Sequence, residues 1–246
     1  MSGKVDIAVE LAIYCPMLQL PKVVGHRGAA AYAPENTLES FREAKRRGAT
    51  WVEIDVKLTA DSVPILMHDA SLKRTTGIDR LVAETRAADL PGDVPTFAAA
   101  IDCFRELGLG CNVEIKPCEG REAETGRAAV ETLRRCWPAS LPAPMLSSFK
   151  DASLAAALEA APEYVRASLI DEIKDDWLVR AKAVQAVGIN TSGKKLTAPQ
   201  AVAIKKAGFI LSVYTINEGD VARALVGMGA DCVITDAPDV ILQALA

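Results

Sequence analysis

The sequence predicts a single-domain α/β protein folded as a (β/α)8 TIM barrel. Three observations support this prediction. Short runs rich in β-branched residues alternate with amphipathic stretches, and no linker rich in Pro, Gly or Ser divides the chain. Alternating strands and helices indicate a parallel sheet, and about eight such units in 246 residues favour a closed barrel over an open sheet. We therefore assign residues 1–246 to one domain.

Nine segments have the pattern of strands: residues 22–26, 51–58, 64–69, 111–116, 144–149, 164–170, 186–191, 209–216 and 231–236. This is one more than a barrel needs. The joint at 59–63 is also too short for a helical crossover, which usually takes about a dozen residues. Either the chain runs back there without a helix, or one segment is not a barrel strand. The polar, irregular stretch 70–95 predicts an excursion over the strand ends.

Amphipathic stretches between the strands predict the helices. In residues 36–48 the apolar side chains share one face, Asn36 is placed to cap the first turn, and Gly48 ends the helix. The same logic predicts helices within residues 151–162, 197–208 and 218–230.

Composition excludes several classes of protein. The formal net charge is −4, whereas a nucleic-acid partner requires a concentrated basic face. The six cysteines form no CxxC pair, so we expect reduced, mostly buried thiols and a cytoplasmic location. Residues 5–20 are apolar but contain Asp6 and Glu10, which are costly in lipid. We expect a short helix or strand covering the barrel end there, not a signal peptide or a stable membrane anchor.

Acidic residues recur where strands end, and in parallel barrels function collects at the carboxyl ends of the strands. Glu53 and Asp55 are two residues apart on one strand, so both point to the same face, and Glu114 and Lys116 repeat that spacing. Three carboxylates at one barrel mouth would repel one another unless a cation is present, and oxygen ligands suit Mg²⁺, Ca²⁺ or Mn²⁺. Alternatively, each acid pairs with a lysine or arginine across the barrel.

Both histidines of the chain also lie at strand ends, as His26-Arg27 and His68-Asp69. Two imidazoles beside a metal ion make a general acid/base pair. Arg27 and Lys116 add positive charge suited to an anion such as phosphate. No GxxxxGK[ST] motif is present, so the pattern predicts phosphoryl transfer without a nucleotide-binding loop.

The ordered motifs HRG, PENT, EIDVKLT, PILMHD, VEIKP, MLSSF, VYTIN and VITDAPD extend over nearly the whole chain. From Pro21 to Leu245 the sequence resembles the glycerophosphodiester phosphodiesterase family. It is most similar to the short cytosolic bacterial enzymes associated with glycerol 3-phosphate uptake. Many members of that family have Trp at the position of Tyr214, which we interpret as a variation in how the alcohol is contacted.

The resemblance implies a phospholipase C-like barrel and roles for individual residues. Members of the family often have an insertion after the third strand, and the excursion at 70–95 is at most a short version of it. His26 and His68 would be the acid/base pair, and Arg27 and Lys116 would hold the phosphate. The divalent cation would bind Glu53, Asp55 and Glu114, with Glu35 and Asn36 behind them. Ser148, Phe149 and Tyr214 would form the pocket wall, and Asp236 a structural cap of the final helix.

The activity implied by the resemblance is metal-dependent hydrolysis of small-molecule glycerophosphodiesters to sn-glycerol 3-phosphate and an alcohol, through a cyclic phosphate or by direct attack of water. A lysophospholipase D-type or phosphoinositide-cleaving enzyme is an alternative. It usually needs an apolar rim or an anchor, and only 5% of this chain is aromatic. A catalytically inactive barrel that binds glycerophosphodiesters is a second alternative, but no residue of the predicted catalytic set is missing.

Overall fold

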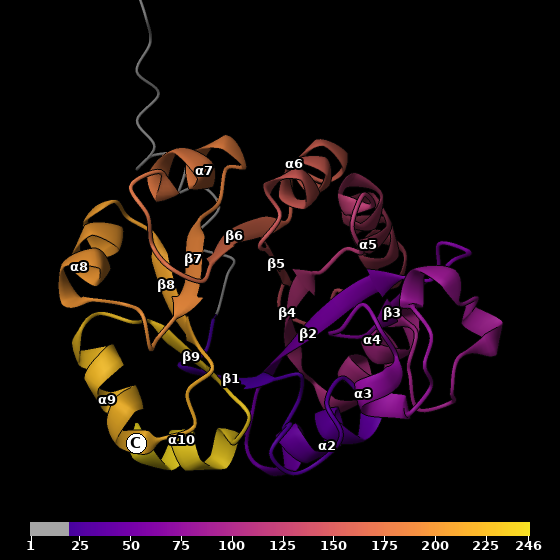
Figure 1. The fold of residues 1–246 in the computed structure, drawn as a ribbon. Coiled ribbons are helices and arrows are strands. Elements are labelled where there is room, and N and C mark those ends of the chain that lie inside the picture. The colour runs from indigo at the N-terminus through magenta and orange to yellow at the C-terminus, as the bar shows by residue number, and fades with distance from the viewer. Residues whose placement is uncertain (1–19) are drawn as a thin grey trace, which may run out of the picture.

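Eight parallel strands form a closed barrel within a ring of helices in the computed structural model, which describes residues 20–246 (Figure 1). Strand β1 pairs with both β2 and β9, which closes the barrel and confirms the predicted fold. The element expected at residues 5–20 lies, except for Leu20, outside the described residues. The barrel strands are β1 (Val23–His26), β2 (Trp51–Leu58), β4 (Gly110–Ile115), β5 (Met145–Ser148), β6 (Val165–Ile170), β7 (Gly188–Ser192), β8 (Ile210–Tyr214) and β9 (Cys232–Thr235).

The surplus strand is β3 (Pro64–Leu66), which runs antiparallel to β2 at the edge of the sheet. The chain reverses at Ser62, whose φ is 60° and whose amide donates to the carbonyl of Thr59 at 3.1 Å. Both expected explanations therefore hold. The chain runs back without a helix, and one of the nine segments is not a barrel strand.

The excursion predicted at residues 70–95 is present beside β3. It contains α3 (Lys73–Thr76) and the 3₁₀ turns η2 (Val82–Glu84) and η3 (Ala87–Asp89). In Figure 1 it projects outward from the barrel next to α4. Leu72 and Val82 are fully buried in a small apolar cluster with Ile65, which fixes the excursion to the barrel.

The larger helices are α2 (Leu38–Arg46), α4 (Phe97–Leu107), α5 (Glu122–Cys136), α6 (Asp151–Ala160), α7 (Trp177–Ala183), α8 (Ala198–Lys206), α9 (Gly219–Gly227) and α10 (Pro238–Ala244). The cap expected at Asn36 is wrong by one residue. Thr37 caps α2, because its hydroxyl accepts from the amide of Ser40 at 3.2 Å. Asn36 instead has a φ of 56°, and its side chain turns into the barrel.

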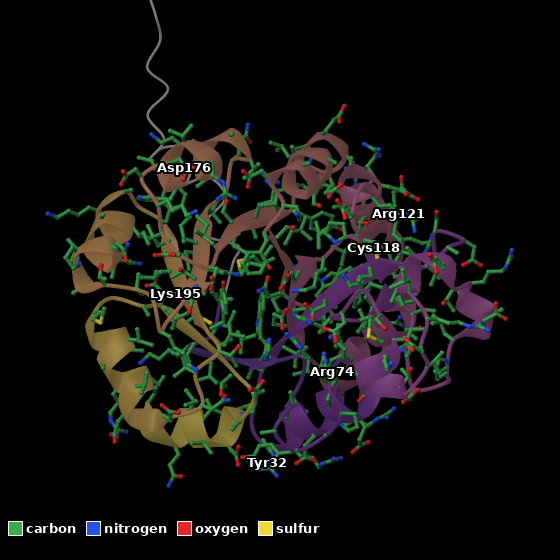
Figure 2. All side chains as sticks on the ribbon, viewed as in Figure 1. Tyr32, Arg74, Cys118, Arg121, Asp176 and Lys195 are labelled. Carbon is green, nitrogen blue, oxygen red and sulfur yellow. The ribbon has the colours of Figure 1, made fainter. Side chains whose placement is uncertain are left out.

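Most of the apolar core lies between the strands and the helices, in two large clusters. A smaller cluster, with Trp51 and Met145 among its members, lies inside the barrel. Side chains fill the space enclosed by the strands (Figure 2). Towards the carboxyl ends of the strands that interior is polar, which is where the predicted site residues lie.

Two further expectations concern the described residues. The cysteines among them are free, and Cys103, Cys111, Cys118 and Cys232 are buried, as predicted. None of the helices in residues 20–246 has both the length and the apolar character needed to cross a bilayer.

Candidate active site

Three carboxylates from two neighbouring strands meet inside the barrel. Glu53 and Asp55 share the inner face of β2, and the strand register places Asp55 directly beside Glu114 of β4. One oxygen atom of each side chain lies within 4.8 Å of the others. The structure therefore brings together the three residues predicted as metal ligands, which we call the acid triad.

Burial makes the acid triad electrostatically costly, since Glu53, Asp55 and Glu114 are 4%, 0% and 7% exposed. Burial and the neighbouring carboxylates raise the pKa of Glu114 to about 7 and that of Glu53 well above its ordinary value. Burial also opposes ionisation of Asp55, but Lys116 and Arg27 hold its pKa below the ordinary value. A divalent cation would relieve the repulsion among the three acids.

The donor atoms of the acid triad fit such a cation. Asp55 Oδ1 is fully buried and accepts no hydrogen bond from residues 20–246, although Lys116 Nζ is 3.4 Å away. A set of carboxylate oxygens is well suited to Mg²⁺, Ca²⁺ and Mn²⁺, which prefer oxygen ligands. The acid triad could therefore bind a metal ion.

His26 ends β1 beside the acid triad, with Nε2 at 3.9 Å from Glu53 Oε2. Its Nδ1 is 2.7 Å from Asp236 Oδ1, and Asn217 donates to the other oxygen of Asp236 at 2.8 Å. The prediction that Asp236 caps the final helix is wrong, because the cap residue Ala237 donates its amide to Thr235. Asp236 is 210 residues from His26, so no local pattern reveals the pair.

His68 follows β3 and has a similar arrangement. Its Nδ1 is 2.6 Å from Asp69 Oδ1, and Asp69 Oδ2 accepts from Nε of Arg74 at 2.6 Å. Arg74, labelled in Figure 2, also donates both terminal nitrogens to Glu35. Burial lowers the pKa of His68, which favours the neutral imidazole. The sequence shows that Asp69 follows His68, but it does not show that Arg74 connects Asp69 to Glu35.

The two predicted phosphate-binding cations lie against the acid triad. Arg27 Nε is 3.1 Å from Asp55 Oδ2, and the Arg27 amide donates to Glu53 at 3.1 Å. Lys116 Nζ donates to Glu114 Oε1 at 2.7 Å. Asp55 and Glu114 therefore have cationic salt partners as well, in part as the alternative considered from the sequence expected, but these partners come from the same or a neighbouring strand and do not lie across the barrel. Both cations line the central cavity, where an anion could reach them.

Of the two residues expected behind the acid triad, Asn36 contacts it directly, and Glu35 contacts Arg27, a salt partner of the triad. Asn36 is buried and donates Nδ2 to Asp55 Oδ2 at 2.9 Å, while its Oδ1 accepts from the Asp55 amide at 3.2 Å. Glu35 accepts from Arg27 Nη1 at 2.9 Å and thereby holds that guanidinium in place.

A cavity of about 210 Å³ opens between the strand ends. Phe149 and Tyr214 form part of its wall, with their rings edge to face at 6.1 Å, and Lys116 Nζ lies 5.5 Å from the Phe149 ring centre. The remaining lining residues are His26, Arg27, Glu53, His68, Asn112, Glu114, Ser147, Leu169, Thr215 and Ile234.

Ser148, predicted as pocket wall, is not among the lining residues. Its hydroxyl donates to the carbonyl of Ile115 at 2.5 Å and accepts from the amide of Lys150. Its neighbour Ser147 faces the cavity instead, because side chains alternate along β5. Asn112 was also missed, although its position two residues before Glu114 puts it on the same inner face.

Comparison with known proteins adds an independent finding. The model of the glycerophosphoryl diester phosphodiesterase family matches residues 26–240, a span that contains every residue of the site described above.

The fold of this chain is similar to that of an Oleispira antarctica phosphodiesterase, which was solved in complex with the product sn-glycerol-3-phosphate. The two structures have a TM-score of 0.89 and 37% sequence identity, and the comparison covers 92% of this chain and 97% of that one. A Thermotoga maritima glycerophosphodiester phosphodiesterase has a TM-score of 0.75 at 26% identity, over 92% and 99% of the two chains. A Bacillus subtilis relative, with a glycerophosphodiester phosphodiesterase name assigned provisionally, is 27% identical over 90% of this chain and 96% of its own.

Proposed function

The chain belongs to the glycerophosphoryl diester phosphodiesterase family and is a glycerophosphodiester phosphodiesterase, and from that premise we propose a metal-assisted mechanism in which His26 and His68 are the acid and base. The substrates are small-molecule glycerophosphodiesters, and the products are sn-glycerol 3-phosphate and an alcohol. The observation that carries the proposal is the geometry of one cavity. Both imidazoles, two cations and two members of the acid triad line it together.

Arg27 and Lys116 bind the phosphate of the substrate. Both line the cavity, and both contact the acid triad at distances of 2.7 to 3.4 Å. A guanidinium can donate two parallel hydrogen bonds to phosphate oxygens, and an ammonium acts as a point charge. Glu35 orients Arg27 for this contact.

A divalent cation such as Mg²⁺, Ca²⁺ or Mn²⁺, held by Glu53, Asp55 and Glu114, would neutralise charge on the phosphate and lower the pKa of an attacking hydroxyl. The experiment with chelator and added cations described below also determines which cation the enzyme prefers.

The histidines move the protons. One imidazole, neutral at Nε2, takes the proton from a glycerol hydroxyl as that oxygen bonds to phosphorus. The other starts as an imidazolium and gives its Nε2 proton to the departing alcohol as the P–O bond of that alcohol breaks. Water then opens the resulting cyclic phosphate, with the two histidines in exchanged roles. Each Nδ1 lies against a carboxylate, at 2.7 Å for His26 and 2.6 Å for His68, so Nε2 of each ring is the atom that exchanges protons.

Replacing either histidine tests this assignment. We expect His26→Ala and His68→Ala each to lower kcat on glycerophosphocholine by about 10²- to 10⁴-fold, as for a lost general acid or base. Arg134→Ala, which removes an exposed ion pair with Glu163 far from the cavity, is the matched control and should retain full turnover. Near-normal turnover by both histidine variants at saturating Mg²⁺ would reject the assignment.

Two further arms examine the metal and the substrate class. Chelation should abolish release of glycerol 3-phosphate, and added Mg²⁺, Ca²⁺ or Mn²⁺ should restore it. Glycerophosphocholine should be cleaved faster than lysophosphatidylcholine. The reverse order would favour a lipid-directed phosphodiesterase, and binding without turnover would favour an inactive barrel.

A further inference from the structure

Arg74 of the excursion contacts two carboxylates that support different parts of the active site (Figure 2). Its Nε donates to Asp69 Oδ2 at 2.6 Å. Its terminal nitrogens donate to both oxygens of Glu35, Nη1 to Oε2 at 2.8 Å and Nη2 to Oε1 at 2.6 Å. All three nitrogen atoms of the guanidinium are therefore engaged. The paired contact with Glu35 is one that the planar fork of an arginine makes and an ammonium does not.

Each of these carboxylates also holds a side chain to which we assign a role in the reaction. Asp69 Oδ1 is 2.6 Å from His68 Nδ1, and Glu35 Oε1 accepts from Arg27 Nη1 at 2.9 Å. In the part of the chain that the structure describes, neither carboxylate has an ion-pair partner other than Arg74 and the side chain that it holds. Arg74 therefore joins His68 to Arg27 in one network.

The carboxylates of this network are charged. A hydrogen bond from Arg74 is the largest cause that lowers the pKa of Asp69, to about 2. Burial opposes ionisation of Glu35, but hydrogen bonds from Arg74 and Arg27 hold its pKa below the ordinary value. Both groups are therefore ionised at neutral pH, and an ionised carboxylate can accept from two donors at once.

The fold of the excursion sets the position of Arg74. Leu72, which precedes α3, is fully buried in the small apolar cluster with Ile65 and Val82. The helix ends one turn later at Gly77, whose φ is 76°. The backbone is thus anchored two residues before Arg74, and it presents the guanidinium to both carboxylates.

We propose that Arg74 is a positioning residue through which the excursion aligns both the imidazole of His68 and the guanidinium of Arg27 with the substrate. This inference rests on the proposed function, because it assumes proton transfer by His68 and phosphate binding by Arg27. Arg74 is not among the residues that line the central cavity, so it acts through the two carboxylates. A misplacement of about 1 Å can cost about 10²-fold in rate.

Steady-state kinetics on glycerophosphocholine test this role. Arg74→Ala should lower kcat by roughly 10- to 100-fold and raise KM by roughly 3- to 10-fold, because proton transfer and phosphate binding both lose their alignment. Arg74→Lys keeps the charge, but its single nitrogen cannot bridge the two carboxylates, so it should recover only part of these losses.

Lys73→Ala is the matched control. It removes the same charge from the same short helix, but the Lys73 side chain is exposed and pairs with Asp79 at 2.9 Å, away from the network. This variant should have wild-type kcat and KM.

Two backgrounds separate positioning from an effect on the fold of the excursion. In an Asp69→Ala background, Arg74→Ala should still raise KM but should lower kcat no further. In a Glu35→Ala background it should still lower kcat but should raise KM no further, since residues of one network have non-additive effects. The Tm of Arg74→Ala should stay within about 4 °C of the wild-type value, because exposed ion pairs contribute little to stability.

Wild-type kcat and KM in Arg74→Ala would overturn the proposal. Full recovery in Arg74→Lys would overturn it too, because charge alone would then suffice. The same would follow from further losses of both kcat and KM in both backgrounds, or from a much larger fall in Tm, because the fold of the excursion would then explain the effect. Failure of the proposed function would look different, since His68→Ala would then retain near-normal turnover whatever the Arg74 variants do.

Discussion

At the scale of single residues, both imidazoles of the site are held by the same device. Each Nδ1 contacts a carboxylate, and each carboxylate is fixed by a second donor, Asn217 for Asp236 and Arg74 for Asp69. A neutral imidazole that donates from Nδ1 presents Nε2 as an acceptor. The pairs therefore set both the tautomer and the direction of the rings, with Nε2 of His26 directed at the acid triad.

The His26 pair yields a prediction. Asp236→Asn should lower kcat on the order of 10²-fold with little change in KM, because a neutral amide can hold the wrong tautomer and cannot stabilise an imidazolium. Asp236→Glu should recover part of the rate. Steady-state kinetics on glycerophosphocholine measure both variants.

Asp239→Asn is the control for this experiment. It removes a carboxylate three residues further along, which pairs with Arg47 at the surface instead of with the site. It should have wild-type kcat. An Asp236→Asn variant that turns over as fast as this control would contradict a positioning role for Asp236.

Residue-scale prediction from the sequence succeeded where the physics is local. The spacing of Glu53 and Asp55 fixes their common face, whatever the rest of the chain does. Prediction failed where the role of a residue depends on which face of a strand it occupies or on a partner far away in the sequence. Ser148 and Ser147 are adjacent and chemically alike, and only the observed orientation of β5 shows which one faces the cavity.

At the scale of elements, the interior of the barrel depends on close packing between neighbouring strands. Gly110 of β4 pairs with Trp51 of β2 in the strand register, and the Trp51 ring covers the position that a side chain at Gly110 would occupy. A Cβ atom there would lie 2.2 Å from Trp51 Cε2. This contact sets the inner wall beneath the acid triad, because Glu53 and Asn112 are the next inward pair on the same two strands.

Gly110→Ala should therefore destabilise the barrel. Overpacking a rigid core costs about 1–3 kcal/mol, which lowers the Tm of a domain of this size by roughly 2–10 °C. Gly92→Ala is the control, because no atom of the part of the chain that the structure describes lies within 4 Å of a Cβ at that position. Thermal unfolding of the two variants should separate them clearly, and equal Tm values would show that Trp51 moves aside without cost.

Element boundaries followed the hydrophobic periodicity closely, and β2 has the predicted limits of 51–58. The pairing direction of β3 was the undecided point. A short apolar run is compatible with a parallel barrel strand or an antiparallel edge strand, and only the length of the connection distinguishes them. The connection at 59–63 already indicated the reversal, but it could not indicate which strand β3 would join.

At the scale of the whole molecule, the fold buries three carboxylates, and two of them, Glu53 and Glu114, raise the cost of folding as they ionise. The folded-state pKa of Glu114 is raised from 4.5 to about 7, and that of Glu53 is raised as well. A raised folded-state pKa gives stability that is present below the unfolded value and lost as pH rises through the folded value. Asp55 has the opposite sign, since its lowered pKa gives stability that is lost only at acidic pH.

Between pH 5 and 8 the two glutamates therefore dominate, and the chelated protein should lose stability as pH rises. The loss should be on the order of 1–3 kcal/mol, or roughly 2–10 °C in Tm. Added Mg²⁺ should raise the Tm more at pH 8 than at pH 5, because the cation binds the ionised carboxylates and must displace protons at lower pH.

Two variants test whether the acid triad causes this change in Tm. Glu114→Gln should reduce the dependence of the Tm on pH. Glu131→Gln makes the same change in net charge at an exposed glutamate of α5 and should leave that dependence unchanged. A chelated wild-type protein with the same Tm at both pH values, or a Glu114→Gln variant with an undiminished slope, would show that the acid triad is already neutralised by Arg27 and Lys116 and does not need a cation.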